Sequence, residues 1–114
     1  MNIVEQLLYF AERDAELLEN IRGRGDDPTV SREVDFCLAT DDGERAETVC
    51  SFINDNRYGN ARVETSDSSY RIITVAKVPL DPPIIHAMSA NMVSVAHLFK
   101  VEYMGWGCPL QIPG

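Results

Sequence analysis

The sequence predicts an α+β protein: a ferredoxin-like βαββαβ sandwich with a four-stranded antiparallel sheet and an additional N-terminal helix. Three segments carry apolar residues at helical spacing. One strand-like segment lies between the first and the second of them, two lie between the second and the third, and one follows the third. The chain has 114 residues, of which 45% are hydrophobic and 25% charged, so it has the length and composition of one globular domain.

The first 22 residues form the first helical segment, because apolar side chains recur there at three- and four-residue steps. Gly23 and Gly25 supply its stop signal. Its apolar stripe is wider than a solitary helix would keep in water. We therefore expect residues 1–24 to form a helix that packs on a ferredoxin-like domain made of residues 25–114.

The first strand is expected over residues 30–39, where Val34, Phe36 and Leu38 alternate with more polar neighbours that include Cys37. The next helix is expected to be capped by Thr40 or Asp41, since Asp41 and Glu44 have the spacing of a capping box. Its buried stripe is expected to contain Ala46, Val49, Cys50 and Ile53.

Two further strands are expected over residues 61–66 and 70–78, joined by a polar hairpin. Asp81 is expected to cap the third helix, with proline at its first position. A last short strand is expected at about residues 100–104, with Trp106 following it.

The third helical segment, residues 82–99, contains no charged residue. One face can lie on the sheet, and the flank with Ala87, Val93 and Leu98 needs a second cover. Either the N-terminal helix or a second subunit could provide it. We expect the N-terminal helix in this place, and a homodimer is the alternative.

Charge narrows the class of partner. Ten basic and 18 acidic residues give a net charge of −8. Residues 70–114 have a net charge of +1, so the negative charge lies in the first two thirds of the chain. An acidic chain is a poor binder of nucleic-acid phosphates or of an anionic membrane, and it favours a basic protein partner. Three widely spaced cysteines and the lack of a visible secretory signal predict a cytoplasmic protein.

No metal or cofactor motif is present, and we expect no cofactor. His86 and His97 lie on one helix about 16 Å apart along its axis, which is too far to hold one ion together. The alternative function is a small-molecule binder or enzyme with a pocket lined by Cys37, His86 or His97. An acidic mimic of nucleic acid is a third possibility.

Two segments are candidates for binding a protein. The first is the acidic start of the second helix, which is also explained by solvation and by the helix dipole. It contains Asp41, Asp42, Glu44 and Glu47. The second surrounds the single tryptophan, Trp106, which either plugs the end of the core or forms an aromatic anchor for a partner.

The segment Val101-Glu102-Tyr103-Met104-Gly105-Trp106-Gly107 resembles the V-E-Y-D-G-W-G ending of the RraB family, regulators of ribonuclease E activity. The leading helix and the turn at residues 25–28 are similar to the opening of that family, and the order of elements agrees over about residues 2–110. Met104 stands where the family commonly has Asp.

The resemblance implies a cytoplasmic, non-enzymatic regulator with a ferredoxin-like fold. Such proteins bind the RNA-degrading ribonuclease E-type endonuclease and restrain its cleavage of transcripts. The resemblance also implies that the matching positions are candidates for binding the protein partner: Glu102, Tyr103, Gly105, Trp106 and Gly107.

Overall fold

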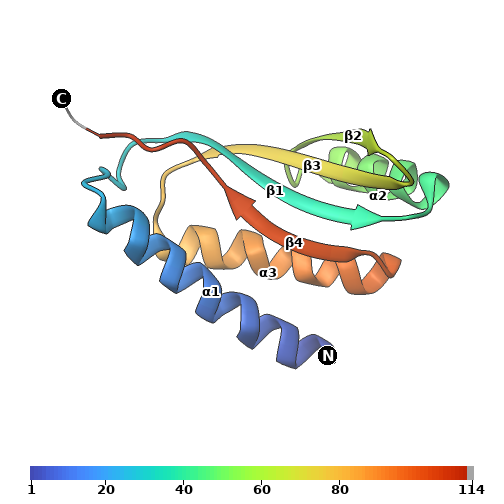
Figure 1. Cartoon of the computed structure of the whole chain (residues 1–114), viewed down its shortest axis with the longest axis horizontal. Helices are drawn as coiled ribbons and strands as arrows, with labels where there is room; N and C mark the ends of the chain where they lie inside the picture. The colour runs from blue at the N-terminus through green and yellow to red at the C-terminus, as the bar shows by residue number, and fades with distance from the viewer. Residues whose placement is uncertain (113–114) are drawn as a thin grey trace.

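The computed structural model describes residues 1–112 and contains three helices and four strands, shown in Figure 1. In chain order they are α1 (Ile3–Gly23), β1 (Arg32–Thr40), α2 (Gly43–Asp55), β2 (Asn60–Ser66), β3 (Ser69–Val78), α3 (Pro82–Phe99) and β4 (Glu102–Gly107). The strand order in the sheet is β2-β3-β1-β4, and all neighbouring strands are antiparallel. The predicted α+β fold, four antiparallel strands behind an N-terminal helix, is confirmed.

The core lies between one face of the sheet and the helices. Val34, Phe36 and Leu38 alternate along β1 and are fully buried, as the sequence pattern predicts. From the helices, Ile53 of α2 and Met92 of α3 pack into the same cluster. Glu33 and Asp35, on the opposite face of the sheet, are exposed, so the helices cover one face only.

Helix α1 lies alongside α3, on the side of α3 that the sheet does not cover (Figure 1). Leu18 and Ile21, in its second half, join the core cluster. Val93 of α3 is fully buried, in agreement with the prediction that α1 covers this flank. The other two flank residues are exposed, and Leu98 keeps 66% of its surface in solvent. That part of the prediction is wrong. Leu98 lies beyond the stretch of α3 that faces α1, which runs from His86 to Val93, and Ala87 lies within this stretch but is not among the residues that face α1.

The start of α2 differs from the predicted capping box. Thr40 is still part of β1, where it pairs with Tyr70. The N-cap is therefore Asp42, whose carboxylate accepts a hydrogen bond from the Arg45 amide at 3.2 Å. Asp41 belongs to the connection before the cap.

Strand β4 also begins and ends later than expected. Lys100 adopts the left-handed conformation with φ 57° as the C-cap of α3, so the chain turns there and pairs with β1 only from Glu102 onward. The strand continues to Gly107, and Trp106 is therefore a residue of the strand rather than of a loop after it.

A buried ion pair fastens the connection between α1 and β1. The Arg32 guanidinium donates to Asp26 Oδ1 at 2.5 Å, and both side chains are 1% exposed. The same oxygen accepts a hydrogen bond from the Gln111 amide at 2.6 Å. Burial raises the pKa of Asp26, but the hydrogen bonds from Arg32 and Gln111 outweigh it and leave that pKa below its ordinary value. The loop, β1 and the segment after β4 are thereby held at one point.

Candidate protein-binding site

A β-bulge in β4 decides where the aromatic residues of the Trp106 segment point. Cys37 pairs with Gly105, but the next residue of β1, Leu38, pairs with Tyr103, so Met104 is the extra residue of the bulge. Gly105 has φ 109°, a conformation that glycine adopts readily. Without the bulge, side chains three positions apart would lie on opposite faces. With it, Tyr103 and Trp106 both lie on the helix-covered face, opposite Leu38 and Phe36.

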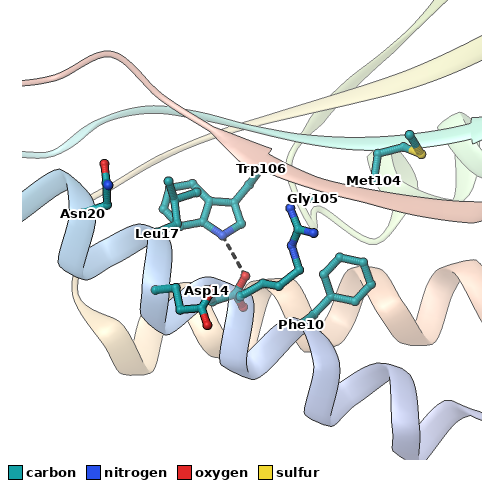
Figure 2. A pocket seen from close by; sticks show the side chains of 9 residues that line it. Phe10, Asp14, Leu17, Asn20, Met104, Gly105 and Trp106 are labelled. Atoms are coloured by element: carbon teal, nitrogen blue, oxygen red, sulfur yellow. Dashed lines mark hydrogen bonds between the residues drawn. The ribbon is translucent and has the colours of Figure 1, made fainter.

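Trp106 connects the edge of the sheet to α1. Its indole N–H donates to Asp14 Oδ1 at 2.9 Å, and Asp14 is only 3% exposed (Figure 2). Leu17, on the next turn of α1, lies beside the indole in the same view. A buried carboxylate needs such a donor, because an unpaired one would lose its hydration without replacement. Trp106 therefore supplies a hydrogen bond to one oxygen of Asp14 and fixes α1 against β4.

Tyr103 connects the same strand to both helices. Its hydroxyl group is 3.1 Å from Ser89 Oγ of α3, within hydrogen-bond distance. Its ring lies 4.6 Å from that of Phe10 of α1, centroid to centroid. Burial raises the pKa of the Tyr103 phenol well above its ordinary value, so the hydroxyl group stays protonated. Tyr103 is a packing residue in this arrangement.

A groove of about 540 Å³ runs between α1 and β4 beside the indole (Figure 2). Arg13, Glu16 and Asn20 form its α1 wall, and Met104, Gly105 and Trp106 form its β4 wall. Trp106 is half-buried there, while Met104 keeps 45% of its surface exposed. Part of the indole is thus accessible to a partner.

The acidic residues of α2 lie at the end of the molecule where β4 begins. Asp41, Asp42, Glu44 and Glu47 are all exposed. Glu102 pairs with Ala39, two residues before Asp41, and is exposed too. We call these five residues the acidic end.

A second groove, of about 900 Å³, opens between the start of α2 and the end of α3. Asp42, Glu44 and Glu47 line it on one side, and the exposed Leu98 with Lys100 lines it on the other. Strand pairing therefore places Glu102 beside the end of β1, close to Asp41 and the start of α2. Tyr103, Gly105, Trp106 and Gly107 follow along β4 toward Asp35, away from these acids.

In the described part of the chain, Cys37 does not share a pocket with either histidine. Cys37 lies on the outer face of the sheet, 3.9 Å from Arg71 Nη1, and His97 is exposed on α3. His86 lines a cavity of about 200 Å³ between α1 and α3, where its Nδ1 is 3.6 Å from Asp14 Oδ2. The sheet separates this histidine from Cys37.

The other two thiols are poor nucleophiles. Burial raises the pKa of the Cys50 thiol, and the nearby Glu47 carboxylate adds to this effect. Burial also raises the pKa of Cys108. The thiolate is the reactive form, so a raised pKa lowers reactivity.

A comparison with protein families decides the family. The profile described as "Regulator of ribonuclease activity B" matches residues 11–108. The chain belongs to the RraB family. Among curated proteins, the comparison found no match.

The RraB match covers the sheet, α2, α3 and the second half of α1. It includes Asp14 as well as Trp106, and therefore both ends of the hydrogen bond that joins α1 to β4. It begins at Ala11, so Met1–Phe10 lie outside it. RraB proteins are regulators of ribonuclease activity, a function that implies a protein partner.

Three features of this RraB-family chain cannot be predicted from the spacing of residues in the sequence. Asp14 reads as one more solvated acid of an amphipathic helix, although its position between Phe10 and Leu17 places it on the apolar stripe. Arg32 reads as a strand-end cation, and no local pattern identifies its partner Asp26. Leu98 belongs to an apolar helix, and only the position of α1 shows that it is exposed.

Within the described part of the chain, no three His, Cys, Asp or Glu side chains gather as a metal site. None of the helices described for residues 1–112 is long and apolar enough to cross a membrane.

Proposed function

We propose that this RraB-family protein binds a ribonuclease E-type endonuclease through its acidic end and thereby restrains RNA cleavage, without catalysing a reaction itself. The proposal rests on the family match together with three exposed carboxylates, Asp42, Glu44 and Glu47, that line one groove with the apolar Leu98. Asp41 and Glu102 are exposed near the start of the same groove. In this proposal the protein acts in the cytoplasm and binds a basic surface of the endonuclease rather than RNA.

Electrostatics gives the acidic end its selectivity. Asp42 and Glu44 lie at the start of α2, where the helix dipole stabilises negative charge. Carboxylates on one surface raise the association rate of a basic partner and repel RNA phosphates. Leu98 adds apolar contact area on the opposite side of the same groove.

The other positions of the Trp106 segment that match the RraB ending have a structural role in this proposal. All four residues, Tyr103, Gly105, Trp106 and Gly107, form β4, and the side chains of Tyr103 and Trp106 contact α1. Glu102 is the one member of the segment that belongs to the acidic end.

The test replaces four carboxylates of the acidic end by amides: Asp41→Asn, Asp42→Asn, Glu44→Gln and Glu47→Gln. Asparagine still caps α2, so the fold is retained. We expect affinity for a ribonuclease E-type endonuclease to fall about tenfold or more at low salt. Binding is measured by calorimetry, and inhibition by the rate at which the nuclease cleaves a defined transcript.

The matched control removes the same amount of charge elsewhere. Glu33→Gln, Asp35→Asn, Asp55→Asn and Glu64→Gln change exposed residues on the outer face of the sheet or at the end of α2. We expect affinity close to that of the unmodified protein. Equal losses in both variants would show a net-charge effect and overturn the role of the acidic end.

Salt dependence is a second readout of the same experiment. The Debye length is about 10 Å at 0.1 M salt, so raising the salt from about 0.05 to 0.3 M should weaken binding of the unmodified protein. The variant of the acidic end should respond less. An endonuclease that neither binds the protein nor is inhibited by it would contradict the proposed function as a whole.

A further inference from the structure

Helix α1 has a second apolar stripe that the protein itself leaves uncovered. Val4 is 60% exposed and Leu8 67%, and Ala11 and Ala15 are exposed as well. These four residues, the α1 stripe, recur at steps of four, three and four, the spacing of one helix face. Scattered exposed apolar residues need no explanation, but a row along one face of a helix is typical of a contact surface.

The α1 stripe differs from the face that packs on the rest of the protein. Phe10, Asp14 and Leu17 face Trp106 and β4, and Leu18 and Ile21 enter the core. At 100° per residue, the α1 stripe lies about 105° around the helix from this packed face. Intramolecular packing therefore gives no account of Val4, Leu8 and Ala15.

A row of acids borders the α1 stripe. Glu5, Glu12 and Glu19 are exposed and seven residues apart, so they form a row about 70° around the helix from the stripe. We call them the α1 acidic row. An apolar stripe beside evenly spaced carboxylates matches an amphipathic helix whose apolar face is bordered by Lys or Arg.

On its other side, the α1 stripe continues onto α3. Ala11 lines the cavity between the two helices together with His86 and Ala90. Pro83 and Ala87, farther out on α3, are exposed, and α3 carries no charged residue. The two helices thus form a shallow surface that is apolar in the middle, acidic along α1 and uncharged along α3.

We propose that this surface of α1 and α3 docks a basic amphipathic helix of a protein partner. The occupant places its apolar residues on Val4 and Leu8 and its Lys or Arg side chains beside the α1 acidic row. This surface is separate from the acidic end. Val4 and Leu8 also lie in the ten residues outside the family match, so the inference does not depend on the ribonuclease as partner.

Charge argues against a second copy of the chain as the occupant. In an antiparallel pair of α1 helices, the acidic rows of the two copies would face each other across the contact. Glu5, Glu12 and Glu19 would then meet carboxylates, and each chain carries a net charge of −8. A basic helix removes this repulsion.

The probe is a synthetic peptide of about 20 residues, long enough to be helical, with Leu at three- and four-residue steps and Lys on both flanks. The ¹⁵N-labelled full chain is titrated with it, and amide shifts are followed by NMR. We expect shifts to concentrate on residues 4–19 and on the outward face of α3. A peptide with the same composition in permuted order, and one with Glu in place of Lys, should give none.

Two variants test the surface itself. Val4→Gln/Leu8→Gln should weaken peptide binding about tenfold or more, because two apolar contacts are lost. Glu5→Gln/Glu12→Gln/Glu19→Gln should weaken it severalfold and reduce its salt dependence. All five positions are exposed, so both variants are expected to fold.

The matched controls are Ile112→Gln, an exposed apolar residue 57% in solvent, and Glu33→Gln/Asp35→Asn/Asp55→Asn. Both should bind the peptide as the unmodified chain does, and so should the variant of the acidic end. Shifts confined to α2, equal binding of the Glu peptide, or no shift at all would overturn the proposal. A dimer in light scattering that Leu8→Gln dissociates would also overturn it, since the occupant would then be a second copy.

Discussion

At the scale of single residues, Trp106 and Asp14 explain how an acidic residue can lie inside this protein. Asp14 Oδ1 accepts the indole N–H. Its second oxygen has no hydrogen-bond partner among the described residues, and neither has His86 Nδ1 3.6 Å away. The indole is thus the donor that makes burial of this carboxylate tolerable. An aromatic ring alone would fill the space without meeting that need.

Replacing Trp106 by Phe should therefore destabilise the protein although an aromatic ring is retained. We expect a loss of about 1–3 kcal/mol in the free energy of unfolding, because Asp14 keeps its burial and loses its donor. Urea unfolding measures this loss. Tyr9→Phe is the control, since it removes an exposed hydrogen bond with Arg13 and should change stability by no more than about 0.5 kcal/mol. Equal effects of the two substitutions would contradict the role of the indole N–H.

At the scale of secondary structure elements, the bulge in β4 depends on the backbone of Gly105. Its φ of 109° is strained for any residue with a side chain, whereas the space around it is open. We expect Gly105→Ala to cost about 1–3 kcal/mol of stability through backbone strain.

Gly107→Ala is the matched control for this strain. Gly107 also has open space around it but no positive φ. Its substitution should leave the unfolding free energy within about 0.5 kcal/mol of the original value. Thermal and urea unfolding of the two variants compare them directly, and a loss of similar size at both positions would show that φ at Gly105 is not the cause.

The elements that sequence periodicity predicts well are those whose pattern is local. The alternation of Val34, Phe36 and Leu38 places β1 and its buried face, and Asp81 and Pro82 place the start of α3. The end of β4 is not local, because it depends on pairing across a bulge with Cys37 and Leu38. The cap of α2 fails for a similar reason, since Thr40 is retained by its partner in β3.

At the scale of the whole molecule, the pair of Arg32 and Asp26 joins the connection between α1 and β1 to the segment after β4 through Gln111. Because the pKa of Asp26 is lowered in the folded protein, the carboxylate contributes stability that is complete above the unfolded value of about 3.8 and is lost as the pH falls through the folded value. Stability should therefore decrease on acidification below about pH 4.

Asp26→Asn should remove this part of the pH dependence and cost about 3–5 kcal/mol at neutral pH, because Arg32 would stay buried without a counter-charge. Unfolding free energies between about pH 7 and 2 measure both effects. Asp55→Asn, at an exposed position, is the control. A variant with the same acid sensitivity as the unmodified protein would rule out Asp26 as its origin.

In the candidate sites, too, features that depend on neighbouring residues can be predicted from the sequence, whereas features that depend on strand pairing cannot. Composition and helix position identify Asp41, Asp42, Glu44 and Glu47 as an exposed acidic set, and all four are exposed. That Glu102 joins them follows from strand pairing, which no sequence spacing contains. The inward direction of Trp106 likewise follows from the bulge. The sequence alone therefore does not decide whether Trp106 fills the end of the core or binds a partner.

The bulge also bears on which mutations this part of the chain can absorb. Met104 is the extra residue of the bulge and keeps 45% of its surface in solvent, so many side chains fit there, acidic ones included. Its omission is compatible with the same pairing: without Met104, Tyr103, Gly105 and Trp106 would pair with Leu38, Cys37 and Phe36 in regular alternation, and the indole would still face Asp14. Neither a change of residue type at this position nor the loss of its single codon should therefore detach the first helix from the sheet.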